Sequence, residues 1–160
     1  MSGRGNTQID PRGQRFAAAI TSVVLGLAIV LGPPIGLVLL AVQTFVFAFG
    51  AVLGLHLQPY AVIYRRYVAP RLSPPTALTS DRPSRFAQGL GMLISVIALL
   101  AGTVGADAVF YLFAGAALAA AFLNAAFTYC LGCDLYRRFS HISHHADLTD
   151  KRVDRDVTVG

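Results

Sequence analysis

The sequence predicts an all-α membrane protein in which four transmembrane helices form two parallel helix-hairpin repeats. Composition is the first observation: 55% of the 160 residues are hydrophobic and 13% are charged, whereas about a quarter of a soluble domain is charged. The second is that the apolar residues gather in four runs close to the length that crosses roughly 30 Å of hydrocarbon. The third is that all thirteen lysines and arginines lie outside these runs.

The first hairpin follows a polar, basic segment, residues 1–15, which we expect to be mobile. A basic segment before an apolar run also resembles a signal peptide, which ends at a cleavage site of small residues. Here the run 16–31 ends in Gly32-Pro33-Pro34 and a second apolar run, 35–57, follows at once. We therefore expect a retained helix and a tight antiparallel hairpin.

The second hairpin follows a basic loop, residues 58–85, that prolines interrupt. Its spans are predicted at about 86–104 and 108–130, and the short link between them carries no positive charge. The four-helix domain as a whole extends over 16–139. Residues 140–160 form a polar tail that contains histidines and has no apolar periodicity, so no structure is expected there.

The basic residues also predict the orientation of the chain. They lie in the N-terminus, the central loop and the C-terminal tail, and the two short turns contain none. Because cytoplasmic loops carry an excess of Lys and Arg, both termini and the central loop are predicted to be cytoplasmic. The predicted location is the bacterial plasma membrane, with the lipid bilayer as the first partner.

The two halves of the chain resemble each other. Arg15-Phe16-Ala17 opens the first hairpin and Arg85-Phe86-Ala87 opens the second, while Tyr64-Arg65-Arg66 after the first corresponds to Tyr136-Arg137-Arg138 after the second. Any two membrane hairpins have basic flanks, but the matched triplets favour an internal duplication. Two such units share one orientation and are related by an axis along the membrane normal.

The only cysteines, Cys130 and Cys133, form a C-x-x-C motif at the end of the last apolar run. Such a pair supports thiol–disulfide exchange when one thiol ionises readily. On a continued helix the two thiols share one face, but the negative end of that helix opposes a thiolate. Arg137 and Arg138 are the candidate electrostatic support.

Two other interpretations of the cysteines stay open. They are small buried thiols with no chemistry, or they bind Zn²⁺ together with the histidines of the tail, which are His141, His144 and His145. The spacing of that second set differs from standard zinc fingers, so no metal site is predicted. No cofactor motif is present, and no recognition motif accompanies the basic charge, which argues against nucleic acid.

Few polar residues lie inside the spans. Gln43, Gln88 and Asn124 are expected to face the bundle interior and form hydrogen bonds between helices. A transport pathway would show an ionisable residue deep in a span, and the sequence has none. The sequence therefore argues against a carrier.

Specific motifs give a resemblance to a known family. Residues 85–91 (RFAQGLG), Asn124 and residues 130–136 (CLGCDLY) resemble the uncharacterised bacterial membrane family called domain of unknown function 4395. The resemblance covers roughly 8–139. It implies that Cys130 and Cys133 are signature residues. It also implies an actinobacterial setting, where genes of this family often neighbour those of thioredoxin-like proteins and sulfurtransferases.

These observations predict an integral membrane protein that uses its C-x-x-C at the cytoplasmic boundary for thiol–disulfide or sulfur-relay chemistry. Its partner would be a cytoplasmic thioredoxin-like protein or a sulfurtransferase. The alternative is a non-enzymatic scaffold that docks partners through the basic loop and that can form homo-oligomers. Enzymatic activity stays open, and the sequence favours its absence.

Overall fold

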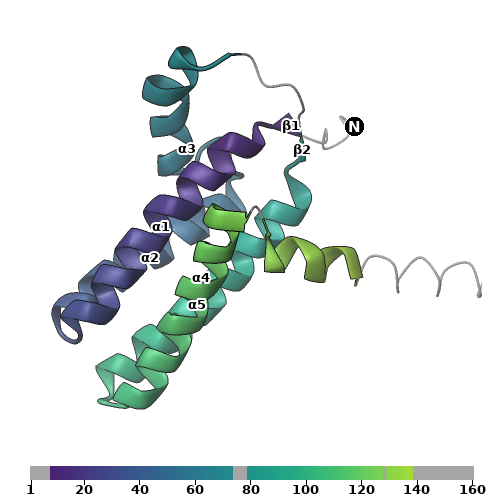
Figure 1. Ribbon diagram of the computed structural model, residues 1–160. Coiled ribbons are helices and arrows are strands. Elements are labelled where there is room, and N and C mark those ends of the chain that lie inside the picture. Colours follow the sequence, from purple (N-terminus) through teal and green to yellow (C-terminus); the bar gives the residue numbers. More distant parts are fainter. Residues whose placement is uncertain (1–7, 74–78, 128, 139–160) are drawn as a thin grey trace, which may run out of the picture.

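Four long helices form a bundle in the computed structural model, which describes residues 8–73, 79–127 and 129–138 (Figure 1). All four are long and apolar enough to cross a membrane. Both the all-α class and the four membrane-spanning helices are thus confirmed. They are α1 (Pro11–Leu31), α2 (Ile35–Val52), α4 (Arg82–Thr103) and α5 (Asp107–Phe127).

Short elements gather at the end of the bundle where α1 and α4 begin (Figure 1). Two short strands pair antiparallel, with Gln8 opposite Ser80 and Ile9 opposite Thr79. They join the segment before α1 to the segment before α4. The short elements are β1 (Gln8–Ile9), α3 (Pro59–Ile63), the π-helix η1 (Tyr64–Val68), the 3₁₀-helix η2 (Ala69–Arg71), β2 (Thr79–Ser80) and a last helix over 131–138.

Helix bounds differ from the predicted spans at several places. Helix α1 begins at Pro11 rather than Phe16, because the Asp10 carboxylate accepts a hydrogen bond from the Arg12 N–H at 2.9 Å and caps the helix. Proline at the first helical position suits this start. Helix α2 ends at Val52 and α5 at Phe127. Residues 1–7 and 139–160, most of the predicted termini, lie outside the described residues.

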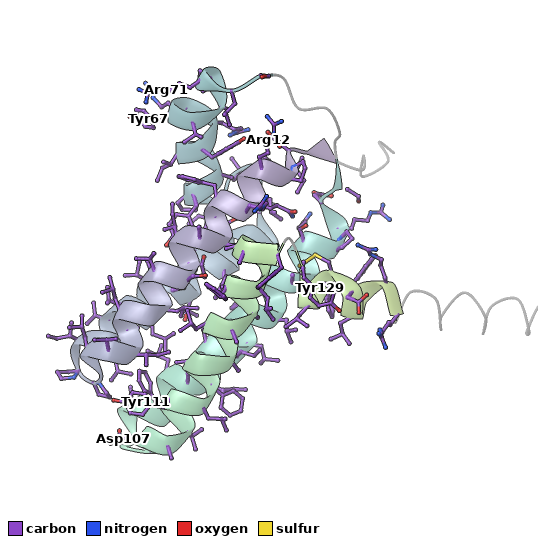
Figure 2. The ribbon with its side chains drawn as sticks, viewed as in Figure 1. Arg12, Tyr67, Arg71, Asp107, Tyr111 and Tyr129 are labelled. Carbon is purple, nitrogen blue, oxygen red and sulfur yellow. A yellow bond between two sulfur atoms is a disulfide. The ribbon has the colours of Figure 1, made fainter. Side chains whose placement is uncertain are left out.

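The two hairpin turns lie at the opposite end of the bundle (Figure 1). Gly32 and Gly105 adopt positive φ angles of 59° and 77° there, a conformation that glycine accepts without steric cost. A Cβ at Gly32 would lie 2.9 Å from the Tyr111 hydroxyl of α5. Figure 2 shows Asp107 and Tyr111 at this end and Arg12, Tyr67 and Arg71 at the other. The described basic residues therefore lie at one end of the molecule.

The core is built largely from small side chains. Leu25, Leu40 and Phe110 are fully buried, and alanines of α4 and α5 fill the space around them. Small side chains let helices approach closely, which drives association where lipid offers no hydrophobic gain. Many large apolar side chains point outward, among them Val30, Phe45, Leu112 and Phe127, as expected of surfaces that face lipid.

Each hairpin has an arginine near its start that binds the end of the other hairpin. Arg15 of α1 donates to the Ala125 carbonyl near the end of α5 at 3.3 Å. Arg85 of α4 donates to the carbonyls of Ala51 and Val52 at the end of α2, at 2.8–3.2 Å. Terminal carbonyls have no partner within their own helix, so these arginines satisfy groups that would otherwise be exposed near lipid.

Two aromatic pairs hold the segments that follow each hairpin. The ring of Phe16 lies 5.7 Å from that of Tyr64, and Phe86 lies 5.7 Å from Tyr136, with interplanar angles of 45° and 49°. Tyr64 is buried and donates a hydrogen bond to the Asp10 carboxylate at 3.0 Å. Burial, reinforced by this carboxylate, raises the pKa of Tyr64.

Tyr64→Phe is expected to lower the free energy of unfolding by about 1.5–3 kcal/mol, because the change removes one hydrogen bond to a charged group and keeps the ring. Thermal unfolding in detergent, followed by far-UV circular dichroism, measures the loss. Tyr136→Phe is the matched control, since within the described residues the Tyr136 hydroxyl forms no hydrogen bond. An equal loss in both variants would contradict the role assigned to the Asp10 contact.

Candidate functional site

Cys130 lies between the end of α5 and the last helix, 131–138, and Cys133 lies in the first turn of that helix. They form a disulfide whose Cα atoms are 5.2 Å apart, drawn in yellow near Tyr129 in Figure 2. The last helix turns away from the axis of α5 (Figure 1). The motif therefore lies where the chain leaves the bundle, as its sequence position predicts.

The predicted continuation of the fourth helix through the motif is wrong. Helix α5 ends at Phe127, Cys130 is not helical, and a new helix starts at 131. The Cys133 N–H donates to the Cys130 sulfur at 3.3 Å, and the Asp134 N–H donates to the Cys130 carbonyl at 3.0 Å. Cys130 thus occupies the N-cap position of the last helix.

This placement reverses the electrostatic expectation. The positive end of a helix dipole is at the N-terminus, where a negative charge is favoured. Cysteines at helix N-termini have lowered thiol pKa values and react readily. The objection that a C-terminal helix end opposes a thiolate therefore does not apply to Cys130.

The two sulfurs differ in access. Cys133 is 8% exposed, whereas Cys130 is only partly buried and lines a cavity. A partner therefore reaches the Cys130 sulfur more easily than the Cys133 sulfur. The geometry suits Cys130 as the thiol that exchanges and Cys133 as the thiol that closes the disulfide.

The motif packs against helix α4. A Cβ at Gly132 would lie 2.6 Å from the Ala87 Cβ and 2.7 Å from its Cα, so the last helix touches the α4 backbone at this point. The contact between Phe86 and Tyr136 lies one turn further along the helix. The motif is thus packed against a membrane-spanning helix.

The arginines after the motif form no hydrogen bond with a cysteine among the described residues. Arg138 forms an ion pair with Asp134 at 3.2 Å, and Asp134 also accepts from the Tyr129 hydroxyl at 3.4 Å. Arg137 is exposed. In the described part of the chain neither arginine contacts a cysteine, so their electrostatic support stays a prediction.

The alternative metal site has no described component beyond the cysteines. His141, His144 and His145 lie outside the described residues. Within residues 8–73, 79–127 and 129–138, no three His, Cys, Asp or Glu side chains gather in a way that could hold a metal ion.

The polar residues of the spans behave differently from one another. Gln43 donates to the Thr21 hydroxyl at 3.2 Å and thereby links α2 to α1, which confirms its predicted role. Gln88 accepts from Gln58, which precedes α3, at 3.4 Å. Asn124 forms no hydrogen bond with another described residue.

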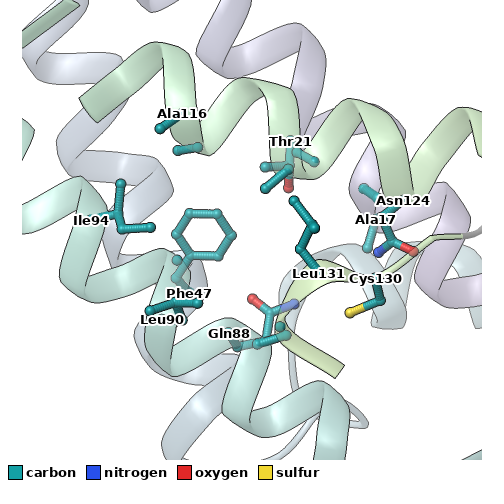
Figure 3. A pocket seen from close by; sticks show the side chains of 17 residues that line it. Ala17, Thr21, Phe47, Gln88, Leu90, Ile94, Ala116, Asn124, Cys130 and Leu131 are labelled. Carbon is teal, nitrogen blue, oxygen red and sulfur yellow. The ribbon is translucent and has the colours of Figure 1, made fainter. Parts of the chain in front are cut away.

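A cavity of about 310 Å³ adjoins Cys130 within the bundle. Figure 3 shows Asn124, Cys130 and Leu131 on one side of it and Phe47 and Ile94 on the opposite side. The sequence alone does not predict this cavity. Its available signal is the run of small residues at 114–121, which leaves space where large side chains would fill it.

Fold and site together define an integral membrane protein with four membrane-spanning helices and a two-cysteine motif at one end of the bundle. The chain matches a protein family described as a domain of unknown function, DUF4395, over residues 9–141. It belongs to that family. No curated protein and no solved structure matches the chain.

Proposed function

We propose that this protein carries out thiol–disulfide exchange at the membrane surface, with Cys130 as the exchanging residue. The observation that carries the proposal is the position of the Cys130–Cys133 pair at a helix N-terminus, with Cys130 accessible and Cys133 buried. This is the arrangement in which one thiolate is stabilised and the other is protected.

The exchange proceeds in two balanced steps. A thiolate of the partner attacks the Cys130 sulfur, forms a mixed disulfide and releases Cys133 as a thiolate. A second partner thiolate attacks the partner's sulfur in the mixed disulfide and releases Cys130 as a thiolate. Two electrons pass from the partner dithiol to Cys130 and Cys133, and the helix N-terminus favours Cys130 as the leaving group.

The proposed partner is a cytoplasmic thioredoxin-like protein. Arg12 and Arg71 lie toward the end of the bundle that carries the disulfide (Figure 2), and positive charge favours the cytoplasmic side. A sulfurtransferase that carries a persulfide is the alternative partner, and it would react with the same two cysteines in their reduced form. Its outer sulfur passes to the Cys130 thiolate, and attack by Cys133 on Cys130 then forms the disulfide and releases hydrosulfide.

We also propose that the two hairpins arose by duplication. Support comes from contacts between corresponding positions. The Gln14 amide donates to the Ser84 hydroxyl across the bundle, seventy positions apart, and β1 pairs with β2. The two arginines, Arg15 and Arg85, and the two phenylalanines, Phe16 and Phe86, are likewise seventy positions apart, and their tyrosine partners are seventy-two apart.

A docking function is the second candidate. The segment over α3, η1 and η2 exposes Arg65, Arg66, Tyr67 and Arg71, a basic and aromatic surface that suits an acidic partner. Under this alternative, replacement of the exposed arginines abolishes the phenotype and replacement of both cysteines does not.

Redox titration of the cysteines in isolated membranes tests the proposal. We expect a two-electron midpoint within roughly −200 to −300 mV, measured by thiol alkylation and mass shift, because a pair that exchanges with cytosolic thiols must lie near their potential. The Cys130→Ser, Cys133→Ser double variant shows no shift. Thiols that stay reduced and unreactive at every potential would overturn the proposal in favour of docking.

Single variants then separate the roles of the two sulfurs. The Cys130 thiol in Cys133→Ser is expected to react with iodoacetamide at least about tenfold faster than the Cys133 thiol in Cys130→Ser, because the helix N-terminus stabilises its thiolate. Alkylation rates measured across pH give both the thiolate pKa and the limiting rate. Equal pKa values would argue against Cys130 as the exchanging residue.

A further inference from the structure

The cavity beside Cys130 lies within the part of the bundle that spans the membrane. Its walls come from α1, α2, α4 and α5, together with residues 130–132. Ala116 and Leu131 line it and are also exposed, so it opens to the surface that faces lipid. A ligand of this cavity therefore enters from the bilayer and must be soluble in lipid.

The cavity walls suit a flat apolar ring. Alanine and glycine residues, among them Ala17, Ala121 and Gly91, form much of the lining, and Phe47 and Ile94 flank one side (Figure 3). Its volume of about 310 Å³ is near the lower end of small-molecule sites, roughly 300–1,000 Å³. One substituted ring fills such a space, and a longer apolar chain would extend into lipid.

Hydrogen-bond donors line the same cavity. The Asn124 amide forms no hydrogen bond within the described residues, and the described bond of Gln88 uses its oxygen. Both amide N–H₂ groups are thus available to carbonyl oxygens of a ligand. Among few polar groups in an apolar site, such donors fix the orientation of a ligand.

We propose that this cavity binds a lipid-soluble quinone that accepts the electrons of the reduced Cys130–Cys133 pair. This inference rests on the proposed thiol–disulfide function. Cys130 lines the cavity, so a ligand bound there lies beside the pair and can accept two electrons from the dithiol. A quinone carries two electrons, dissolves in lipid, contains a flat ring and offers carbonyl oxygens to the two amides.

The proposed step balances without another reactant. The thiols of Cys130 and Cys133 lose two electrons and two protons, and the S–S bond forms as the two S–H bonds break. Each carbonyl oxygen of the quinone gains one proton, and the ring becomes a quinol. The partner dithiol then reduces the disulfide again, so electrons pass from the cytoplasm into the bilayer.

Reduced protein in nanodiscs, mixed anaerobically with decylubiquinone, tests the step. All ring positions of this quinone are substituted, which blocks addition of the thiol to the ring. We expect one quinol per protein, measured by absorbance, together with loss of alkylatable thiols. Asn124→Leu is expected to slow the reaction about tenfold, as loss of one hydrogen bond of about 1.4 kcal/mol would, and to leave the thiol midpoint unchanged.

Two further variants complete the test. Ala121→Phe fills the cavity and is expected to slow the quinone reaction at least as much as Asn124→Leu. Leu135→Ala, on the last helix outside the cavity, is expected to react at the parent rate. Dithiodipyridine, a small water-soluble disulfide, should oxidise all the variants at the parent rate, which shows that the thiols are intact.

The outcomes separate this proposal from the function on which it rests. A protein that reacts with dithiodipyridine and has a defined midpoint, but does not reduce decylubiquinone, retains the exchange function and has no quinone site. Equal quinone rates in Asn124→Leu, Ala121→Phe and the parent would also overturn the site. If the Cys130–Cys133 pair has no defined midpoint potential, both the exchange function and the quinone site are overturned.

Discussion

Replacement of Gly132 by alanine is expected to lower the free energy of unfolding by about 1–3 kcal/mol, the usual cost of overpacking. The new methyl group would lie 2.7 Å from the Ala87 Cα, and a helix backbone cannot yield as a flexible side chain does. The last helix must therefore shift. Because Gly132 separates the two cysteines, the shift also displaces Cys130 from the cavity.

The measurement is the Tm in detergent, followed by far-UV circular dichroism, with an expected fall of roughly 2–12 °C for a chain of this size. Gly115→Ala in α5 is the control, because a Cβ there meets no atom within 4 Å. Alanine favours a helix by up to about 1 kcal/mol over glycine, so this variant should be neutral or more stable. A Gly132→Ala protein as stable as the control would show that the close approach of the last helix to α4 is incorrect.

The architecture follows from the sequence because the bilayer allows few solutions. A chain that crosses lipid must satisfy its own backbone hydrogen bonds, so four long apolar runs could only become four helices. The start of α1 was also signalled, since Asp10 followed by Pro11 is a typical N-cap and first residue. The apolar run at Phe16 marks only the predicted span, and the first turn of α1 lies before it.

The break between α5 and the last helix could not be predicted from local sequence. No glycine or proline lies between Phe127 and Cys130, so the pattern favours a continued helix. Tertiary contacts accompany the break: Arg15 binds the Ala125 carbonyl, and Gly132 packs on Ala87. Such contacts depend on residues far away in the sequence, about which a local pattern carries no information. This break, rather than the C-x-x-C spacing, gives Cys130 its N-cap position.

The cavity could not be predicted from the sequence for a related reason. A run of alanines predicts close helix packing as readily as an internal space. Which one results depends on the side chains that face it from the other helices, here Phe47, Gly91 and Thr21. Asn124 illustrates the ambiguity. A polar residue in a span predicts an interhelical hydrogen bond, whereas its amide lies at a cavity in the structure.

Gln43→Leu is expected to cost about 2–3 kcal/mol even though leucine is more apolar and similar in volume. The Gln43 side chain is fully buried and serves two partners: it donates to Thr21 at 3.2 Å and accepts from the Tyr60 hydroxyl at 3.0 Å. With leucine at position 43, the Thr21 and Tyr60 hydroxyls both lose their hydrogen bond to this side chain. Thr21 can turn toward a carbonyl of its own helix, but the partly buried Tyr60 hydroxyl loses its partner, and a donor left unpaired in this way costs roughly 1–3 kcal/mol.

Reversible unfolding by SDS in mixed micelles, followed by circular dichroism, measures this loss against a matched control. Thr44→Val in the same helix removes a hydroxyl that, among the described residues, bonds only to the Leu40 carbonyl one turn earlier, and its cost should stay within about 0.5 kcal/mol. A double variant, Gln43→Leu with Tyr60→Phe, should recover part of the loss, because it removes the unpaired hydroxyl as well. If the single and double variants were equally unstable, the contact between Gln43 and Tyr60 would contribute nothing. The hairpin would then depend on packing alone, whereas recovery would show that one glutamine ties α1, α2 and α3 together at the end of the bundle that carries Cys130.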